Sequence, residues 1–289
     1  MIGRTALFTP ANNPARINAT VAIKSDSLVF DLEDSISPEE KDAARILLRE
    51  ALKSLDFLGD RNILIRVNDP STENFVQDIS EIGPLGCFPL MIPKASEAVI
   101  CEAEKELREL EAKGSFNYKI PMIPVIETPS GVESVNEILK ASPRIIGVVF
   151  GAEDFTAAMG VPRTKDITQL LYARSRIAIA ARAAGIESMD TPFPDIDDIE
   201  GLREEAQSAR LLGFTGKQAI HPQQIEIIHQ VFTPTPEEIE NARKIVNSFT
   251  EKGGRVISVD GKMVDKPVFK RAKIMLEKSK MSAENRQND

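Results

Sequence analysis

Short apolar runs alternate with longer stretches in which apolar residues recur at helical spacing along most of this chain of 289 residues. The apolar runs occupy residues 4–8, 27–33, 62–67, 86–93, 119–126, 144–150, 185–189 and 217–220. Several of them, such as residues 145–150 (IIGVVF), contain no alternating polar positions. Continuous apolar runs of this kind are typical of parallel strands that are covered on both faces. The pattern predicts eight parallel strands, each followed by a helix.

The stretches between these runs carry recognisable helix boundaries. In residues 41–55, alanine and leucine side chains recur at helical spacing, which predicts an amphipathic helix. Residues 37–40 (SPEE) and 235–238 (TPEE) each provide a hydroxyl for the N-cap, a proline at the first helical position and a glutamate at the third. Gly185 follows the helical stretch 170–184 and is expected to end it.

Eight strand–helix units form either a closed barrel or a doubly wound sheet, and the number of units favours the barrel. The predicted fold is therefore an α/β (β/α)₈ TIM barrel over residues 1–233. The pattern changes in residues 234–289, where a helix at 236–251 precedes a hairpin signal around Asp-Gly at 260–261 and a last helix at 267–280. This part is a C-terminal helix–hairpin–helix extension.

Composition narrows the possible partners and compartments. The formal net charge of −8 argues against nucleic acid or an anionic membrane surface as a partner. No apolar run is long enough for a signal peptide or a membrane span. Cys87 and Cys101 form neither a disulfide framework nor a zinc pattern, so we expect a cytoplasmic protein. Cys87 lies in an apolar run and is expected in the core.

Polar residues follow several predicted strands at the end where barrel enzymes carry their active site. Glu127 follows the fifth strand and Asp154 follows the sixth. Two carboxylates with open water positions suit Mg²⁺, whereas two histidines and two cysteines without ligand spacing do not suit zinc. Each carboxylate alone could equally cap a helix or pair with a loop cation. Together, beside Arg66, they predict a magnesium site.

Arg66 ends the third strand after an apolar run. Its guanidinium is either a clamp for a carboxylate or a developing enolate oxygen, or a partner for Asp31 or Asp34 in the barrel mouth. The two interpretations are compatible, and we keep Arg66 as a site residue.

An acidic cluster made of Asp31, Glu33 and Asp34 follows the second strand. These carboxylates are expected to orient Arg66, Lys94 or water on the metal. For Asp34 the favoured alternative is an ion pair with Lys41 or Arg45 of the next helix. His221, before Pro222, is either a catalytic acid or base or a structural hydrogen-bonding group, and we favour the second. No phosphate-binding or dinucleotide-binding loop is present.

Eight short motifs, taken together, indicate a relationship to a known family. They are residues 4–10 (RTALFTP), 30–35 (FDLEDS), 65–68 (IRVN), 126–131 (IETPSG), 150–155 (FGAEDF), 171–174 (LYAR), 220–222 (IHP) and 260–267 (DGKMVDKP). In this order the chain resembles the citrate lyase β-subunit-like proteins of the aldolase/citrate lyase superfamily. The resemblance implies a (β/α)₈ barrel, Mg²⁺ and homo-oligomers, often trimers. It also implies that the arm at 234–289 contributes to a neighbouring subunit's active site.

The resemblance also assigns roles to residues. Glu127 and Asp154 match the metal ligands, and Arg66 matches the group that stabilises a thioester enolate. Asp265 matches the proton-transfer acid or base delivered by the arm. The pattern alone indicates only a turn residue at Asp265, before Pro267.

The implied activity is that of an oxo-acid lyase, which cleaves a carbon–carbon bond in a 3-hydroxyacyl thioester. The products are a keto acid such as oxaloacetate and an acetyl thioester. Backbone N–H groups of Gly151, Ala152 and Glu153 would bind the keto-acid carboxylate. The implied substrates are citryl-carrier protein, with citrate lyase α and γ subunits as the implied partners, or citramalyl- or malyl-coenzyme A.

Alternatives remain open at this point. Departures from the citrate lyase pattern at Ala11, His221 and residues 160–164 leave the choice between carrier protein and coenzyme A undecided. The same site could instead direct water at a malyl-type thioester, as a hydrolase. It could also serve a metal-dependent aldolase acting on free keto acids, or a non-catalytic subunit, which Arg66, Glu127, Asp154 and Asp265 argue against.

Overall fold

The computed structural model describes residues 2–54 and 61–287 of the chain. Their contacts divide the chain into two compact units, Met1–His229 and Gln230–Asp289. The division falls inside helix α10 (Gln223–Phe232), slightly before the expected boundary at 233/234. Leu55, the predicted last residue of the first long helix, lies outside the described residues.

The first unit is built around a closed barrel of eight parallel strands in the order β1 to β8, with β8 returning to pair with β1. The strands are β1 (Thr5–Pro10), β2 (Ser27–Asp31), β3 (Asn62–Arg66), β4 (Leu90–Ile92), β5 (Met122–Ile126), β6 (Gly147–Phe150), β7 (Glu187–Asp190) and β8 (Gly216–Ala219). Each lies within or overlaps one predicted run, and the predicted barrel is confirmed.

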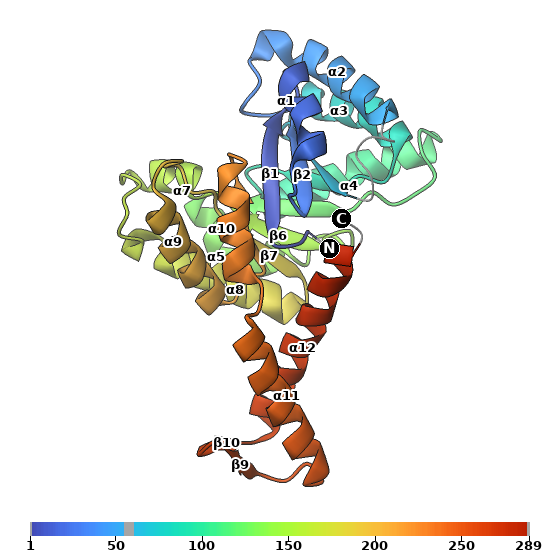
Figure 1. Cartoon of the computed structure of the whole chain (residues 1–289). Coiled ribbons are helices and arrows are strands. Elements are labelled where there is room, and N and C mark those ends of the chain that lie inside the picture. The colour runs from blue at the N-terminus through green and yellow to red at the C-terminus, as the bar shows by residue number, and fades with distance from the viewer. Residues whose placement is uncertain (1, 55–60, 288–289) are drawn as a thin grey trace. The chain divides into compact units, whose positions relative to one another are not determined.

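Helices follow the strands around this barrel (Figure 1). They are α1 (Pro14–Ala19), α2 (Lys41–Lys53), α3 (Glu73–Ile82), α4 (Glu97–Ala112), α5 (Pro129–Glu133), α6 (Val135–Ile138), α7 (Ala152–Met159), α8 (Thr168–Ala184), α9 (Ile199–Leu212) and α10. Gly185 ends α8 with φ of 72°, in the left-handed region where glycine is favoured, as predicted.

Two local predictions need correction. Ser37 precedes a separate 3₁₀ turn (Pro38–Glu40) and makes no side-chain cap hydrogen bond, so α2 itself begins only at Lys41. Cys87 is exposed, because the strand that was expected to include it begins only at Leu90. Cys101 is exposed as well, and both thiols are free.

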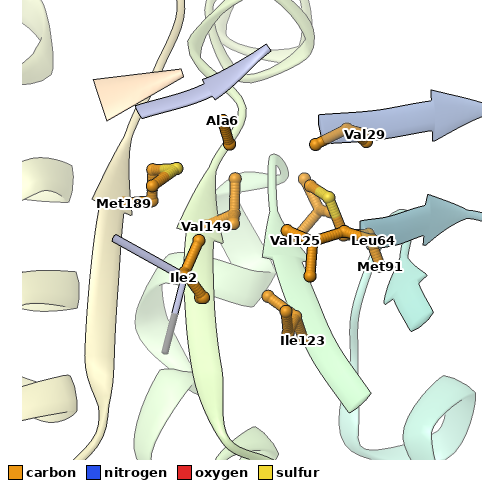
Figure 2. Packing of buried hydrophobic residues seen from close by; sticks show 9 residues of the cluster. All are labelled: Ile2, Ala6, Val29, Leu64, Met91, Ile123, Val125, Val149 and Met189. Carbon is orange, nitrogen blue, oxygen red and sulfur yellow. The ribbon is translucent and has the colours of Figure 1, made fainter. Parts of the chain in front are cut away.

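The barrel interior is filled by alternate residues of the strands. Ala6, Val29, Leu64, Met91, Ile123, Val125, Val149 and Met189 form one buried cluster (Figure 2). Ile2 joins this cluster from the N-terminal segment, and its side chain lies among those of the strands (Figure 2). A Cβ at Gly147 would meet the Cδ1 atom of Ile2 at 2.5 Å. Glycine on β6 therefore makes room for this N-terminal plug.

The second unit contains two long helices and a hairpin. Helix α11 (Pro236–Glu251) begins with the predicted capping box at Thr235 and Glu238. Strands β9 (Ile257–Val259) and β10 (Lys262–Val264) pair in antiparallel fashion across Asp260 and Gly261, both of which have positive φ angles. Such angles are characteristic of the two-residue hairpin turn that the sequence predicts.

Helix α12 (Lys266–Gln287) packs against α11 within this unit and continues well beyond the predicted end at 280. The rings of Phe249 and Phe269 stack between the two helices, with their centroids 4.8 Å apart. Nowhere in the described part of the chain does a helix combine the length and the apolar composition needed to cross a membrane.

Candidate active site

The strand register places several predicted site residues at the carboxyl end of the barrel interior. Core residues Val29, Leu64, Val125 and Val149 are each followed, two positions later, by Asp31, Arg66, Glu127 and Gly151. Residues two apart on a strand face the same side. These four residues therefore continue the inward-facing rows above the apolar core.

Arg66 and Asp31 form a bidentate ion pair between neighbouring strands. Their Cα atoms are register partners on β3 and β2. The Nε and Nη2 atoms of Arg66 both donate to the Asp31 carboxylate at 2.7 Å. The guanidinium also lies over the ring of Phe8, with its Cζ atom 5.2 Å from the ring centroid. The guanidinium of Arg66 is thereby oriented by the carboxylate of Asp31 and by the ring of Phe8.

Asp31 is fixed as an anion by these contacts. Burial alone would raise its pKa, but hydrogen bonds and charge from Arg66 outweigh burial and hold the pKa below its usual value. The carboxylate also accepts from the backbone N–H groups of Glu33 and Ser35. Since Asp31 occupies the Nε and Nη2 atoms, Nη1 is the part of Arg66 that turns toward the other groups of the site.

The other acidic residues of the cluster lie near this Nη1 side of Arg66. Its Nη1 atom lies 3.1 Å from Glu33 and 3.7 Å from the more exposed Asp34. The Nζ atom of Lys94 lies 3.9 Å from Glu33. The sequence therefore identified a group of residues that the structure brings together.

The alternative partners of Asp34 are engaged elsewhere. Lys41 donates through Nζ to the carbonyl oxygens of Leu32 and Glu33. Arg45 pairs with buried Asp78. The ion pair of Asp34 at Arg66 thus replaces the one expected with the next helix.

Glu127 directly follows β5 and is almost completely buried, with 3% of its surface exposed. Its Oε1 atom accepts a hydrogen bond of 2.5 Å from the backbone N–H of Lys94. Lys94 has φ of 47°, an uncommon value for a residue with a side chain, and this conformation is part of the turn that presents its amide. Lys94 thus acts on Glu127 through its backbone, which the sequence could not indicate.

Asp154 lies in the first turn of α7, directly after β6, the strand that pairs with β5. Its side chain is exposed. Its negative charge acts on Glu127, whose pKa is raised to about 7 chiefly by burial, with added repulsion from Asp154 and Asp34. The two predicted metal ligands are therefore close enough to interact electrostatically.

Glu33 experiences a similar environment. Burial raises its pKa to about 8, with further repulsion from Asp34 and Glu127. Its buried Oε2 atom lies 3.1 Å from Nη1 of Arg66 but makes no well-aligned hydrogen bond among the described residues. A cluster of buried carboxylates that repel one another is a favourable environment for a divalent cation.

The arrangement suits a magnesium ion that keeps water or substrate ligands better than a metal ion that is bound by protein ligands alone. In residues 2–54 and 61–287, no three His, Cys, Asp or Glu side chains are grouped as a ready metal site. Mg²⁺ typically binds through one or two carboxylates and keeps several waters or substrate oxygens. Glu127 and Asp154, beside the charged head of Arg66, match that requirement.

The expected role of the backbone amides needs correction at two of the three positions. The N–H of Gly151 donates to the carbonyl oxygen of Ile126, and the N–H of Ala152 donates to the Thr191 hydroxyl. Neither hydrogen is available to a substrate carboxylate. The amide of Glu153 lies at the second position of α7, where backbone N–H groups have no partner within a helix.

Not every polar strand end reaches the barrel interior. Asp190 follows the inward-facing Met189 and is buried with Arg174 and Lys217 on the opposite face of its strand. His221 accepts at Nδ1 from the N–H of Gln223, and this contact matches the structural role that we favoured.

Asp265 belongs to the second unit. Its Oδ1 atom accepts from the N–H of Val268, so this residue caps the start of α12. The cap accounts for the turn pattern in the sequence. Its predicted role in proton transfer depends on a partner subunit and stays a prediction.

Comparison with known proteins places these features in context. The family described as HpcH/HpaI aldolase/citrate lyase matches residues 4–222. The citrate lyase subunit beta of Leuconostoc mesenteroides subsp. cremoris is 40% identical over 275 residues, covering 93% of this chain and 90% of that protein. The mitochondrial citramalyl-CoA lyase of Mus musculus is 32% identical over 289 residues, covering 93% and 83%.

A solved structure extends the likeness to three dimensions. It is protein CitE from Mycobacterium tuberculosis in complex with magnesium, acetoacetate and coenzyme A. The match has a TM-score of 0.79 and 30% sequence identity, and it covers 96% of this chain and 98% of that one.

Proposed function

Because this chain belongs to the HpcH/HpaI aldolase/citrate lyase family, we propose that it is a magnesium-dependent carbon–carbon lyase acting on a 3-hydroxyacyl thioester. The products are a keto acid, such as oxaloacetate, and an acetyl thioester. The observation that carries the proposal is the position of buried Glu127, beside the charge of Asp154, at the end of the barrel where Arg66 is clamped by Asp31.

Glu127 and Asp154 are the ligands we assign to Mg²⁺. When bound, the ion supplies Lewis-acid polarisation of the substrate's hydroxyl and carboxylate oxygens. The backbone N–H of Lys94 fixes one oxygen of Glu127 and leaves Oε2 on the side of Gly151. The protein thus contributes the carboxylate of Glu127, which a hydrogen bond orients at the end of β5, and the exposed carboxylate of Asp154 in α7.

Arg66 receives the charge that develops during the reaction. Cleavage moves the electron pair of the carbon–carbon bond toward the thioester carbonyl, whose oxygen becomes an enolate oxygen. The substrate hydroxyl passes its proton to solvent water and becomes a carbonyl. The Nη1 side of the guanidinium is oriented for that oxygen, since Asp31 holds the other two donors. Donors fixed in advance at the site of developing charge lower the barrier without reorganisation.

A proton must then reach the enolate carbon to give the acetyl thioester. We assign this step to the carboxyl group of Asp265 from a neighbouring subunit, following the family resemblance. The assignment makes the arm part of a partner's active site and requires a homo-oligomer, for which we propose a trimer. The substrate thioester is carried by coenzyme A or by an acyl-carrier protein of a complex with α and γ subunits.

We place the enzyme in the cytoplasm, where the free thiols of Cys87 and Cys101 would stay reduced. The solved relative that contains coenzyme A supports the thioester substrate class. The citramalyl-CoA lyase similarity supports a substrate attached to coenzyme A.

Product analysis tests the reaction. The purified protein with Mg²⁺ would be incubated with citryl-, citramalyl- and malyl-thioesters, attached either to coenzyme A or to a carrier protein. A keto acid together with an acetyl thioester is the expected result, and Asp154→Asn should give neither. Release of the intact hydroxy acid and a free thiol would instead establish a thioesterase. Cleavage only of aldols without a thioester would establish an aldolase.

A further inference from the structure

A buried ionic network lies on the outer side of β7 and β8. Asp190 and Lys217 are fully buried, and the Lys217 Nζ atom donates to Asp190 and to Glu205 of α9, each at 2.7 Å. Arg174 of α8 is also fully buried and forms a second ion pair with Asp190 at 2.8 Å. These residues hold the ends of β7 and β8 against α8 and α9.

One more contact of Lys217 leads from this network to the candidate active site. Its Nζ atom donates to the carbonyl oxygen of Thr191 at 2.7 Å. Thr191 directly follows β7 and is itself fully buried. Its hydroxyl accepts a hydrogen bond of 3.0 Å from the backbone N–H of Ala152, the first residue of α7. Thr191 thus connects the ionic network to the start of α7.

A second contact holds the same helical turn from another side. Arg163, in the loop between α7 and α8, pairs with buried Glu205 at 2.7 Å and with Glu153 at 3.3 Å. Glu153 is the neighbour of Asp154 in the first turn of α7. That turn is therefore tied at Ala152 and at Glu153, and both ties lead to the same buried network.

We propose that Thr191 is a positioning residue that fixes the first turn of α7 and thereby sets Asp154 relative to Glu127. This inference rests on the proposed function, in which both carboxylates bind magnesium. The amide of Ala152 is one of the helix N–H groups that lack an intrahelical acceptor, and it is buried. Without the Thr191 hydroxyl that amide has no acceptor, so the turn would shift toward another one.

The geometry explains why a shift of this turn affects one metal ligand and not the other. Glu127 is fixed independently, by the amide of Lys94 on the other side. Asp154 is exposed, and no side-chain hydrogen bond or ion pair with another described residue holds it, so the turn of α7 defines its place. A displaced turn would therefore change the separation of the two carboxylates.

Variants of Thr191 and one control test the role of its hydroxyl group separately from the rest of the side chain. Thr191→Val keeps the shape of the side chain and removes the acceptor, while Thr191→Ser keeps the acceptor. Thr20→Val is the matched control, because Thr20 is also almost fully buried and its hydroxyl donates to the carbonyl oxygen of Ile17 in α1, the helix that follows β1 and not β6. Thr191→Ala removes the same acceptor and serves if the valine variant does not fold.

The first measurement uses the metal-free protein. Amide hydrogen exchange should become faster in a peptide covering α7 for Thr191→Val, and stay unchanged for Thr191→Ser and Thr20→Val. Unchanged exchange in Thr191→Val would overturn the inference without bearing on magnesium. This result would overturn the positioning role of Thr191 and leave the proposed function untouched. The proposed function would be overturned by a different result, namely that the wild-type chain binds no divalent ion.

The second measurement is the affinity for Mg²⁺, or for Mn²⁺ as its probe, by titration. Loss of a group that orients a metal ligand typically weakens binding by roughly 10-fold to 100-fold, and this is the expected loss for Thr191→Val. Thr191→Ser should restore the affinity, and kcat should fall with it at limiting metal. An equal loss in Thr191→Val and Thr20→Val would indicate general destabilisation and would overturn the positioning role. So would a Thr191→Ser variant as weak as the valine variant.

Discussion

The carboxylate of Glu127 lies against the bare Cα atom of Gly151, which directly follows the neighbouring strand β6. A Cβ atom at Gly151 would sit 2.7 Å from Oε2 of Glu127 and 2.8 Å from its Cβ. The φ angle of Gly151 is −105°, so its backbone does not require glycine. What requires glycine here is the space taken by the candidate metal ligand.

Gly151→Ala should therefore displace Glu127 and weaken Mg²⁺ binding. The carboxylate could rotate away from a new methyl group, but the Glu127 Cβ atom belongs to the strand and could not. We expect a loss of at least tenfold in metal affinity, measured by titration with Mn²⁺. Gly147→Ala is the control on β6, since its new methyl group would meet chiefly the flexible end of Ile2 and should lower stability without affecting the metal. Wild-type affinity in Gly151→Ala would remove Glu127 as a ligand.

Arg66→Lys should lower kcat far more than it raises KM. A lysine keeps the charge but cannot donate two parallel hydrogen bonds to Asp31 while presenting a third donor to the substrate. Removal of one donor to a developing oxyanion typically lowers kcat by roughly 100-fold or more, and we expect a loss of this size. Steady-state kinetics at saturating Mg²⁺ measures it. A variant with normal kcat and raised KM would show that Arg66 only binds the ground state.

We propose that the arm of one subunit contributes Asp265 to the active site of another. Mixing two inactive variants tests this. Glu127→Gln disables the barrel, and Asp265→Asn disables the proposed acid while leaving an amide oxygen to cap α12. If Asp265 serves a neighbouring subunit, unfolding and refolding the two variants together should restore part of the activity. Each variant refolded alone provides the control. No recovery in a mixed oligomer would place Asp265 in its own subunit's site or outside catalysis.

Asp26 should make the barrel sensitive to acid. Burial alone would raise the pKa of its carboxyl, but hydrogen bonds from Arg4 and His229 outweigh burial and hold the pKa well below its usual range. As the pH falls below about 4, the unfolded chain binds a proton at Asp26 and the folded chain does not. The stability that this carboxylate provides is thus present above that pH and is lost below it.

Asp26→Asn should consequently lower stability at pH 7 by roughly 2 kcal/mol, the scale of a charge-assisted hydrogen bond. The difference from the wild type should narrow as the pH is lowered from 5 to 3. Urea denaturation at several pH values measures both quantities. A difference that is constant over this range would mean that Asp26 titrates alike in the folded and unfolded chains.

Much of the fold could be predicted from the sequence, because strands that are buried on both faces consist of continuous apolar runs. The sequence also predicted the hairpin at Asp260 and Gly261 and the capping box at Thr235, since both depend only on residues that are close together in the chain. Strand ends were less certain. The fourth strand is only Leu90–Ile92, and pattern alone extended it over Cys87.

The acidic and basic residues of the site were also identified from the sequence, but their contacts were not. Asp31 and Asp190 both end a strand. Asp31 follows the inward-facing Val29 by two residues, whereas Asp190 follows the inward-facing Met189 by one. A single position decides the face of a strand, so one carboxylate holds Arg66 and the other lies in a buried network outside the barrel.

The sequence by itself determined the order of the strands, the kinds of side chain at their ends and the family to which they belong. Tertiary structure alone decided that Gly151 makes room for Glu127, and that Thr191 takes the amide of Ala152. The reason is physical: these relationships join atoms on different strands within a few ångströms. Such distances are set by the closure and register of the barrel, which no local pattern of residues encodes.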